Sequence, residues 1–141
     1  MADAKFQKVA RGERPLYGPR KMLLCGFPAG AQTKFESLME MLGLSSVPRV
    51  WVTDDQRDAH LAELFSLAPD TGKGSTSTLP RAVIVGGVTE AQLHRLMGGC
   101  KKAGMQQALW AVLTPTSEQW TLEALLSELA AERAAMQQRR R

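Results

Sequence analysis

The stretch ALWAVLTPTSEQWTLEALLSEL, residues 108–129, decides the fold. Residues 108–114 form an almost unbroken apolar run, which is typical of a strand buried on both faces. A Thr-Pro-Thr corner follows, and proline disfavours helical geometry at the residue before it. Four leucines then recur at helical spacing: Leu122, Leu125, Leu126 and Leu129. The stretch therefore predicts a buried strand, a corner and a helix capped by Thr121.

The same order of elements occurs earlier in the chain. Apolar strands are predicted at 21–27, 49–53 and 81–87, and each is followed by an apolar stripe at helical spacing. Asp54 or Asp55 is expected to cap the second helix. Thr89 and Gln92 have the spacing of a capping box at the start of the third helix. The chain thus alternates strands and helices throughout, which favours an α/β fold.

The two halves of the chain also resemble each other at a nearly constant offset. The triplet 24–26 corresponds to the triplet 84–86, sixty residues later, and Thr53 corresponds to Thr114 at an offset of 61. We interpret the pattern as two β-α-β-α repeats. They predict one four-stranded sheet with helices on both faces, the first helix of each half on one side and the second on the other. A ferredoxin-like arrangement and a parallel three-layer arrangement both fit, and the strand order stays open.

Length and charge divide the chain into a body and two basic ends. The 141 residues fit one domain, predicted at 21–137, between a flexible basic arm at 1–20 and a basic tail at 138–141. Residues 1–21 carry a charge of +4, residues 139–141 carry +3, and the remainder carries −3, which sums to the net +4. Basic ends favour docking onto an acidic surface. The residues expected to bind a partner are Arg11, Arg14, Tyr17, Arg20, Lys21, Arg139, Arg140 and Arg141.

Several chemical motifs are incomplete or absent. The segment 70–80 contains GKGST, but Leu67 stands where a phosphate-binding loop has its first glycine, so a mobile loop is the interpretation. Cys25 and Cys100 lie among apolar neighbours and are expected to be buried reduced thiols. No Cys/His cluster with metal-ligand spacing occurs in the sequence. We therefore expect no metal, no cofactor and no enzymatic activity.

One candidate pocket lies where the strands of the second half end. Ligands in open α/β sheets favour the carboxyl ends of strands. The turn after 81–87 and the corner after 108–114 supply five residues there: Gly86, Gly87, Thr114, Thr116 and Trp120. A purely structural role explains the corner as well, because Thr116 can bond local backbone and Trp120 can pack the helix start onto the body.

The closing string resembles that of a small uncharacterised domain family of bacteria. The family pattern is AVLT, five residues, W-[ST]-L, two residues, L, two residues, EL; here it spans Ala111 to Leu129. The strand, turn and helix at 83–97 are also similar to that family, and the resemblance extends over about 22–132. Proteins of this kind also occur as plastid proteins of photosynthetic lineages. The resemblance implies no known activity.

A non-enzymatic adaptor or assembly factor for a larger complex is the function that these features favour. The partner would be a protein complex with an acidic surface, in a bacterium or a photosynthetic organelle. An RNA-binding ferredoxin-like module is one alternative, with nucleic acid as the partner, and a small-ligand or enzyme site at the carboxyl ends of the strands is another. No apolar run is long enough for a membrane span. We expect a soluble protein, stromal if the chain is a trimmed mature form and cytoplasmic otherwise.

Overall fold

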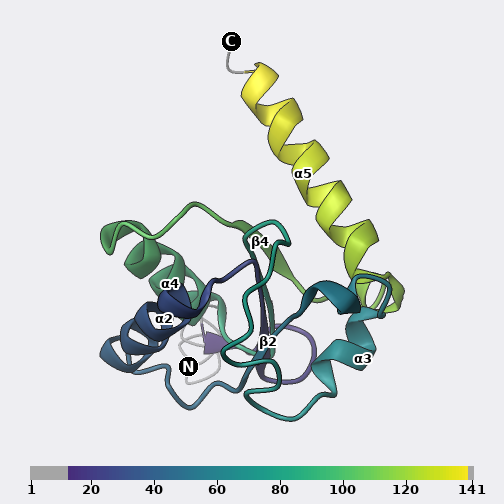
Figure 1. Cartoon of the computed structure of the whole chain (residues 1–141). Helices are drawn as coiled ribbons and strands as arrows, with labels where there is room; N and C mark the ends of the chain where they lie inside the picture. The colour runs from purple at the N-terminus through teal and green to yellow at the C-terminus, as the bar shows by residue number, and fades with distance from the viewer. Residues whose placement is uncertain (1–12, 140–141) are drawn as a thin grey trace, which may run out of the picture.

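The computed structural model describes residues 13–139 and has the predicted α/β class (Figure 1). Strands and helices alternate along the chain, with two short 3-10 turns between them. The elements are β1 Lys21–Cys25, α2 Ala29–Met41, β2 Arg49–Trp51, η1 Asp54–Gln56, α3 Leu61–Phe65, β3 Ala82–Gly86, α4 Glu90–Lys102, β4 Leu109–Val112, η2 Ser117–Gln119 and α5 Leu122–Arg139.

The four strands form one mixed sheet in the order β2-β1-β3-β4. β1 is parallel to β2 and β3 is parallel to β4, whereas the central pair β1 and β3 is antiparallel, with Leu23 opposite Ile84. The two strands of each half are direct neighbours, while the ferredoxin-like fold places another strand between them. The sheet is therefore neither ferredoxin-like nor fully parallel. In each half the first strand lies at the centre of the sheet and the second strand lies at an edge, as two repeats would predict. The repeat itself stays a prediction.

Helices cover both faces of the sheet, as expected (Figure 1). On one face, Phe35 and Met39 of α2 and Leu96 of α4 pack with side chains of the strands. On the other face, the short α3 and the first turns of α5 pack over the opposite side chains, through Leu64 and Leu125 among others. No helix within residues 13–139 combines the length and apolar character that crossing a bilayer requires.

The second helix begins later than the sequence predicted, and an aspartate is not its cap. Asp54 lies in the turn η1, and α3 starts at Leu61 behind His60, which takes part in a capping box with Glu63. The Asp54 carboxylate instead accepts hydrogen bonds from Ser77 Oγ, at 2.7 Å, and from the amide and hydroxyl of Thr78. A partner 24 residues away displaced the local cap, so the prediction of an Asp54 cap was wrong. The caps at Thr89 and Thr121 are confirmed.

The segment 70–80 lies along the outer edge of β2. Asp70 N donates to Arg49 O at 2.7 Å, and Trp51 N donates to Thr71 O at 2.8 Å. The buried Gln32 side chain adds bonds to Ser75 O and from Gly74 N. Two outward backbone groups of β2, Arg49 O and Trp51 N, are thus paired with the chain itself, and the segment packs along this edge.

Part of the predicted arm also packs onto the body. Leu16 N donates to Val88 O at 2.7 Å, and Gly87 N donates to Tyr17 O at 3.1 Å. Pro15 forms an isolated antiparallel bridge with Thr89. The packed chain therefore begins before residue 20, while residues 1–12 lie outside the described part.

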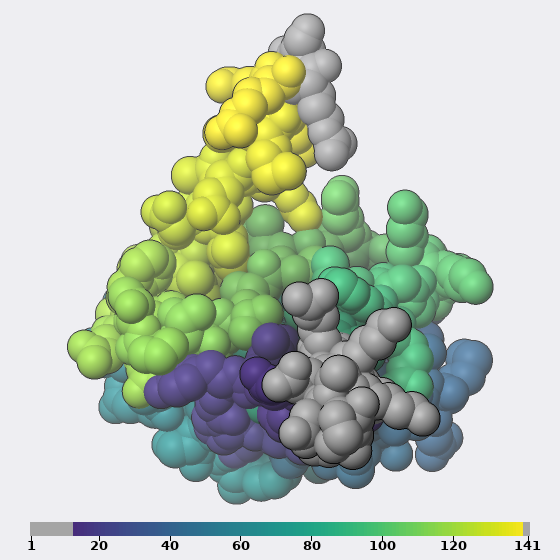
Figure 2. Space-filling model, turned by 180° about the vertical axis from the view of Figure 1, so that it is seen from behind, coloured from purple at the N-terminus to yellow at the C-terminus, as the bar shows by residue number. Residues whose placement is uncertain are grey.

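The last helix extends beyond the rest of the molecule. α5 runs over 18 residues, of which Leu122, Leu125 and Leu126 are buried. Its carboxyl-terminal half stands clear of the body, as Figures 1 and 2 show. Met136 in that half is 54% exposed. The helix therefore presents a free surface beside β4, against which its first turns pack.

Candidate functional site: a cationic cavity beside the open sheet edge

The carboxyl end of β3, where the sequence placed part of a pocket, is covered by the segment 17–20. A Cβ on Gly86 would lie 2.8 Å from Pro19 O, and one on Gly87 would lie 2.5 Å from the Arg20 backbone nitrogen. Both glycines are therefore needed for close backbone packing. Gly86 is buried and Gly87 is half-buried beneath this segment.

The corner residues of the predicted pocket form a local network of their own. Thr114 N donates to Ser117 Oγ at 3.0 Å, and Ser117 N donates to Thr114 Oγ1 at 2.9 Å. Trp120 O accepts a hydrogen bond from Leu61 N, so the corner is joined to α3. Thr116 and Trp120 are exposed, the latter by 37%. These contacts favour the structural role of the corner.

The basic residues expected to bind a partner lie in different places. Lys21 is half-buried, and its Nζ donates to Phe65 O at 2.8 Å and to Leu67 O at 2.6 Å. The Tyr17 hydroxyl donates to the Glu118 carboxylate, and this bond raises the tyrosine pKa. Arg20 donates to the Gln92 amide oxygen. Arg14 and Arg139 are exposed, at opposite ends of the described chain; Arg11, Arg140 and Arg141 lie outside it.

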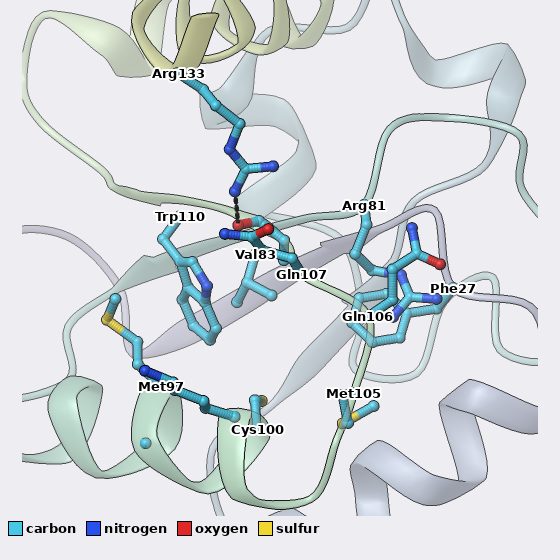
Figure 3. A pocket seen from close by; sticks show the side chains of 13 residues that line it. Phe27, Arg81, Val83, Met97, Cys100, Met105, Gln106, Gln107, Trp110 and Arg133 are labelled. Atoms are coloured by element: carbon cyan, nitrogen blue, oxygen red, sulfur yellow. Dashed lines mark hydrogen bonds between the residues drawn. The ribbon is translucent and has the colours of Figure 1, made fainter. Parts of the chain in front are cut away.

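A cavity of about 540 Å³ lies at the opposite, amino-terminal end of β3 and β4 (Figure 3). α4 forms one wall through Met97 and Cys100, and the loop behind that helix adds Met105 and Gln106. Trp110 of β4 closes one side, and Arg81 with Phe27 closes the other, as Figure 3 shows. Cavities of roughly 300–1,000 Å³ with mostly apolar walls are typical of small-molecule sites.

Arg81 is the charged group most deeply placed in this cavity. Its side chain is 8% exposed, and its guanidinium carbon lies 4.2 Å from the centre of the Phe27 ring. Nε donates to Gly26 O at 2.9 Å. Neither terminal nitrogen donates to any residue in 13–139, and no carboxylate there forms a salt bridge with Arg81. Desolvation accordingly lowers the pKa of Arg81.

The thiol of Cys100 faces the same cavity and is uncharged at neutral pH. Burial raises its pKa to about 11, and the nearby Arg81 only partly opposes the shift. A thiol of such high pKa is a poor nucleophile, because the thiolate is the reactive form. Cys25 is fully buried and its pKa is raised to about 12. Both cysteines are free.

The edge of the sheet beside the cavity is open. Leu109 N donates to Arg81 O at 2.9 Å and Leu113 N donates to Val85 O at 2.8 Å. The alternation along a strand therefore turns the backbone of Trp110 and Val112 outward. Within residues 13–139 the outward groups of these two residues have no hydrogen-bond partner. Arg133 of α5 covers the start of the edge, donating to Ala108 O at 2.7 Å. A second hollow, of about 400 Å³, lies between this edge and Met136.

The second half of the chain also matches a known family model. Residues 81–136 match the family described as a domain of unknown function (DUF3783). The predicted resemblance to an uncharacterised domain family is thereby confirmed for this half, and the closing string stays a prediction. No curated protein and no solved structure matches the chain.

The segment that matches this family model supplies nearly the whole cavity. It begins at Arg81 and includes Arg133, so Phe27 is the one lining residue outside it. The sequence analysis singled out neither arginine. The one available signal in the sequence was the position of Arg81 directly before the apolar run AVIVGG. Its role in the cavity depends on Gly26 and Phe27, which lie beside it because Cys25 pairs antiparallel with Ala82. Within residues 13–139, no group of three or more metal-ligating side chains is found.

Proposed function

We propose that this chain is a non-enzymatic protein-binding adaptor that holds an extended, acidic segment of a larger protein along β4. The observation that supports the proposal is the open edge at Trp110 and Val112, which runs beside the free half of α5. Unpaired edge groups are a template for an added strand, and many binding modules use them in this way.

The two edges of the sheet differ in a way that favours this role. The edge of β2 is paired with the segment 70–71, whereas β4 has a single side-chain bond at its start, from Arg133. Proteins commonly cover exposed edges because these otherwise pair with other chains. An edge left open on one side only therefore offers a docking surface for one partner strand.

The charge around β4 favours an acidic segment as the occupant. Arg81, Lys101 and Arg133 line the adjoining cavity, which has no acidic lining residue, while the hollow between the edge and Met136 is lined by Arg133 and Glu132. None of the three forms a salt bridge within residues 13–139. A second copy pairing through β4 would bring two such cationic sets together, and like charges at an interface oppose binding. In such a partner segment, the backbone of an apolar strand would pair with the edge of β4, and flanking acidic side chains would complement the basic residues beside it.

The partner as a larger complex, and its place in a bacterium or a photosynthetic organelle, are parts of the same proposal. The larger complex is suggested by the basic ends of the sequence, and the bacterial or plastid setting by the resemblance described above. RNA binding through the sheet is not favoured, since helices cover both faces and Trp51 is buried. RNA-recognition sheets need aromatic side chains on an open face.

A proline at the edge tests the proposal. Val112→Pro removes an N–H that points outward, so the bonds of β4 to β3 are retained. Val112→Ala is the matched control, because it shortens the same side chain and keeps the N–H. In affinity purification from the native cell, we expect Val112→Pro to lose the partner protein and Val112→Ala to retain it. Equal recovery with both folded variants would contradict the proposal.

The free half of α5 provides a second, independent comparison. Met136→Glu places a negative charge beside the edge, where an acidic segment would be repelled. Met41→Glu makes the same change at a position that is 77% exposed at the end of α2. We expect the first variant to reduce partner recovery and the second to leave it unchanged. The opposite pattern would place the binding surface elsewhere.

A further inference from the structure

We propose that the 540 Å³ cavity binds the carboxylate of an apolar molecule, with the terminal nitrogens of Arg81 as its partner. The site lies inside the cavity rather than along the edge of β4; it shares Arg81 with the charge considered there, but its test does not depend on the proposed adaptor function. It also differs from the pocket predicted at the carboxyl ends of the strands, which lies at the other end of the sheet.

The first argument is the uncompensated charge of Arg81. Charged groups with little exposure are normally paired, because removing an ion from water is unfavourable unless an opposite charge replaces the water. The Phe27 ring and Gly26 O contact the guanidinium, but neither carries a negative charge. An anion in the cavity would supply the missing counter-charge.

The second argument is the shape of the donor group. With Nε bonded to Gly26 O, the two terminal nitrogens of Arg81 are left for a ligand. Two parallel N–H donors match the two oxygens of a carboxylate, and such paired bonds are among the stronger hydrogen bonds in proteins. Figure 3 shows the guanidinium lying over Phe27 beside Gln106.

The third argument concerns the rest of the ligand. Phe27, Met97, Met105 and Trp110 give the cavity predominantly apolar walls, which suit an aliphatic or aromatic body. The adjoining part of α4 is its carboxyl-terminal half, where the helix dipole is negative. That end disfavours a doubly charged phosphate more than a singly charged carboxylate. Lys101 at the rim adds attraction for one negative charge.

The carboxylate could come from a free small molecule or from the carboxyl terminus of a peptide, and two probes separate these sources. Octanoate is the small-molecule probe, with octanol as its uncharged control. A tripeptide acid, acetyl-Ser-Val-Leu, is the other probe, with its carboxamide as control. Binding is measured by isothermal titration calorimetry on the full chain. Protection of Cys100 from slow alkylation by iodoacetamide at pH 9, where a small fraction of the thiol is ionised, then reports occupancy of this cavity, because Cys25 is fully buried.

Two substitutions locate the site. Arg81→Gln is expected to weaken binding of the acid roughly 10- to 100-fold, as the loss of charge-assisted bonds predicts. Arg95→Gln, on the exposed side of α4, is the matched control and should leave affinity unchanged. Cys100→Leu places a larger side chain in the cavity and retains Arg81. This variant therefore tests the site if Arg81→Gln does not fold. Thermal melting establishes that each variant is folded.

Each outcome supports or overturns the assignment. Octanoate binding that protects Cys100 and is lost in Arg81→Gln or Cys100→Leu supports a free carboxylate, whereas the same result with the tripeptide acid alone supports a carboxyl terminus. Binding of octanol as strong as that of octanoate would overturn the role of Arg81. Failure of both acids to bind, or unchanged binding in the folded Cys100→Leu variant, would overturn the site.

Discussion

Two cations stand at the start of the central strands, and their surroundings differ. Lys21 at the head of β1 donates to two backbone carbonyls, so the protein itself satisfies its charge. Arg81, directly before β3, has one carbonyl and one aromatic ring, and its terminal nitrogens face a cavity. The sequence analysis placed Lys21 among the candidate partner-binding residues and did not single out Arg81. Only the tertiary contacts distinguish a structural cation from a candidate ligand-binding one.

Asp54 gives a prediction at the residue scale. Hydrogen bonds from Ser77 and Thr78 lower its pKa, so the charged form is favoured in the folded protein. The resulting stability is present above the unfolded pKa of about 3.9 and is lost as the pH falls through the lower folded value. We expect Asp54→Asn to lower the melting temperature at pH 7. The difference from the parent protein should shrink as the pH falls below about 4.

Asp55 offers the matched control for this measurement. It is an exposed neighbour in the same turn, and it bonds to Thr53 within that turn rather than to the distant segment. Asp55→Asn is expected to change the melting temperature less than Asp54→Asn at pH 7. Equal effects of both substitutions that do not change with pH would show that the bonds to Ser77 and Thr78 do not make the stability depend on pH.

At the scale of elements, the sequence predicted the strands well and the second helix poorly. The four apolar runs all became strands, because an unbroken run of that length is suited to the interior of a sheet. α3 is shorter than predicted, since Asp54 bonds a segment far along the chain instead of starting the helix. Local propensity cannot anticipate a partner that only the folded chain brings near.

Two adjacent glycines in α4 give a prediction at the same scale. A Cβ on Gly98 would meet no atom within 4 Å, whereas one on Gly99 would lie 2.9 Å from Leu42 Cδ1. Alanine in a helix interior is favoured over glycine by roughly 0.5–1 kcal/mol. We expect Gly98→Ala to raise the free energy of unfolding by about that amount. Crowding against α2 should make Gly99→Ala less favourable, by about 1 kcal/mol or more.

Urea unfolding of the two variants and the parent provides the comparison. Equal stabilisation by both substitutions would show that Leu42 moves aside without loss of packing. Destabilisation by Gly98→Ala would contradict the open surroundings of that position.

At the scale of the whole molecule, the sequence predicted the covered sheet but not its strand order. Apolar strands imply helices on both faces, and these are present. Antiparallel pairing of β1 with β3 depends on how the two halves meet, and the connections are long enough for several arrangements. The candidate cavity is a product of that pairing, because it brings Phe27 and Arg81 together. For this reason a carboxyl-end pocket was predicted and an amino-end cavity was found.

Closure of the β2 edge can be tested through a pair of glycines. Gly72 and Gly43 have similar positive φ angles of 79° and 74°. A Cβ on Gly72 would lie 1.9 Å from Trp51 O, whereas one on Gly43 would meet nothing within 4 Å. We expect Gly43→Ala to cost about 1–2 kcal/mol from backbone strain alone. Gly72→Ala should cost at least about 3 kcal/mol, because the segment must leave β2.

Thermal or urea unfolding again measures the two values. Similar losses for both variants would mean that the segment 70–73 relaxes without detaching. A larger loss for Gly72→Ala would show that this segment contributes to global stability.

The unequal borders of the sheet also limit how copies of this chain can assemble. With β2 paired to its own segment, residues 13–139 leave one open sheet edge per molecule, so pairing through open edges would end at two copies rather than continue into a fibril. One strand bound along β4 would occupy this open edge. The protein would then bind one partner strand per molecule and leave no further edge for strand addition within residues 13–139.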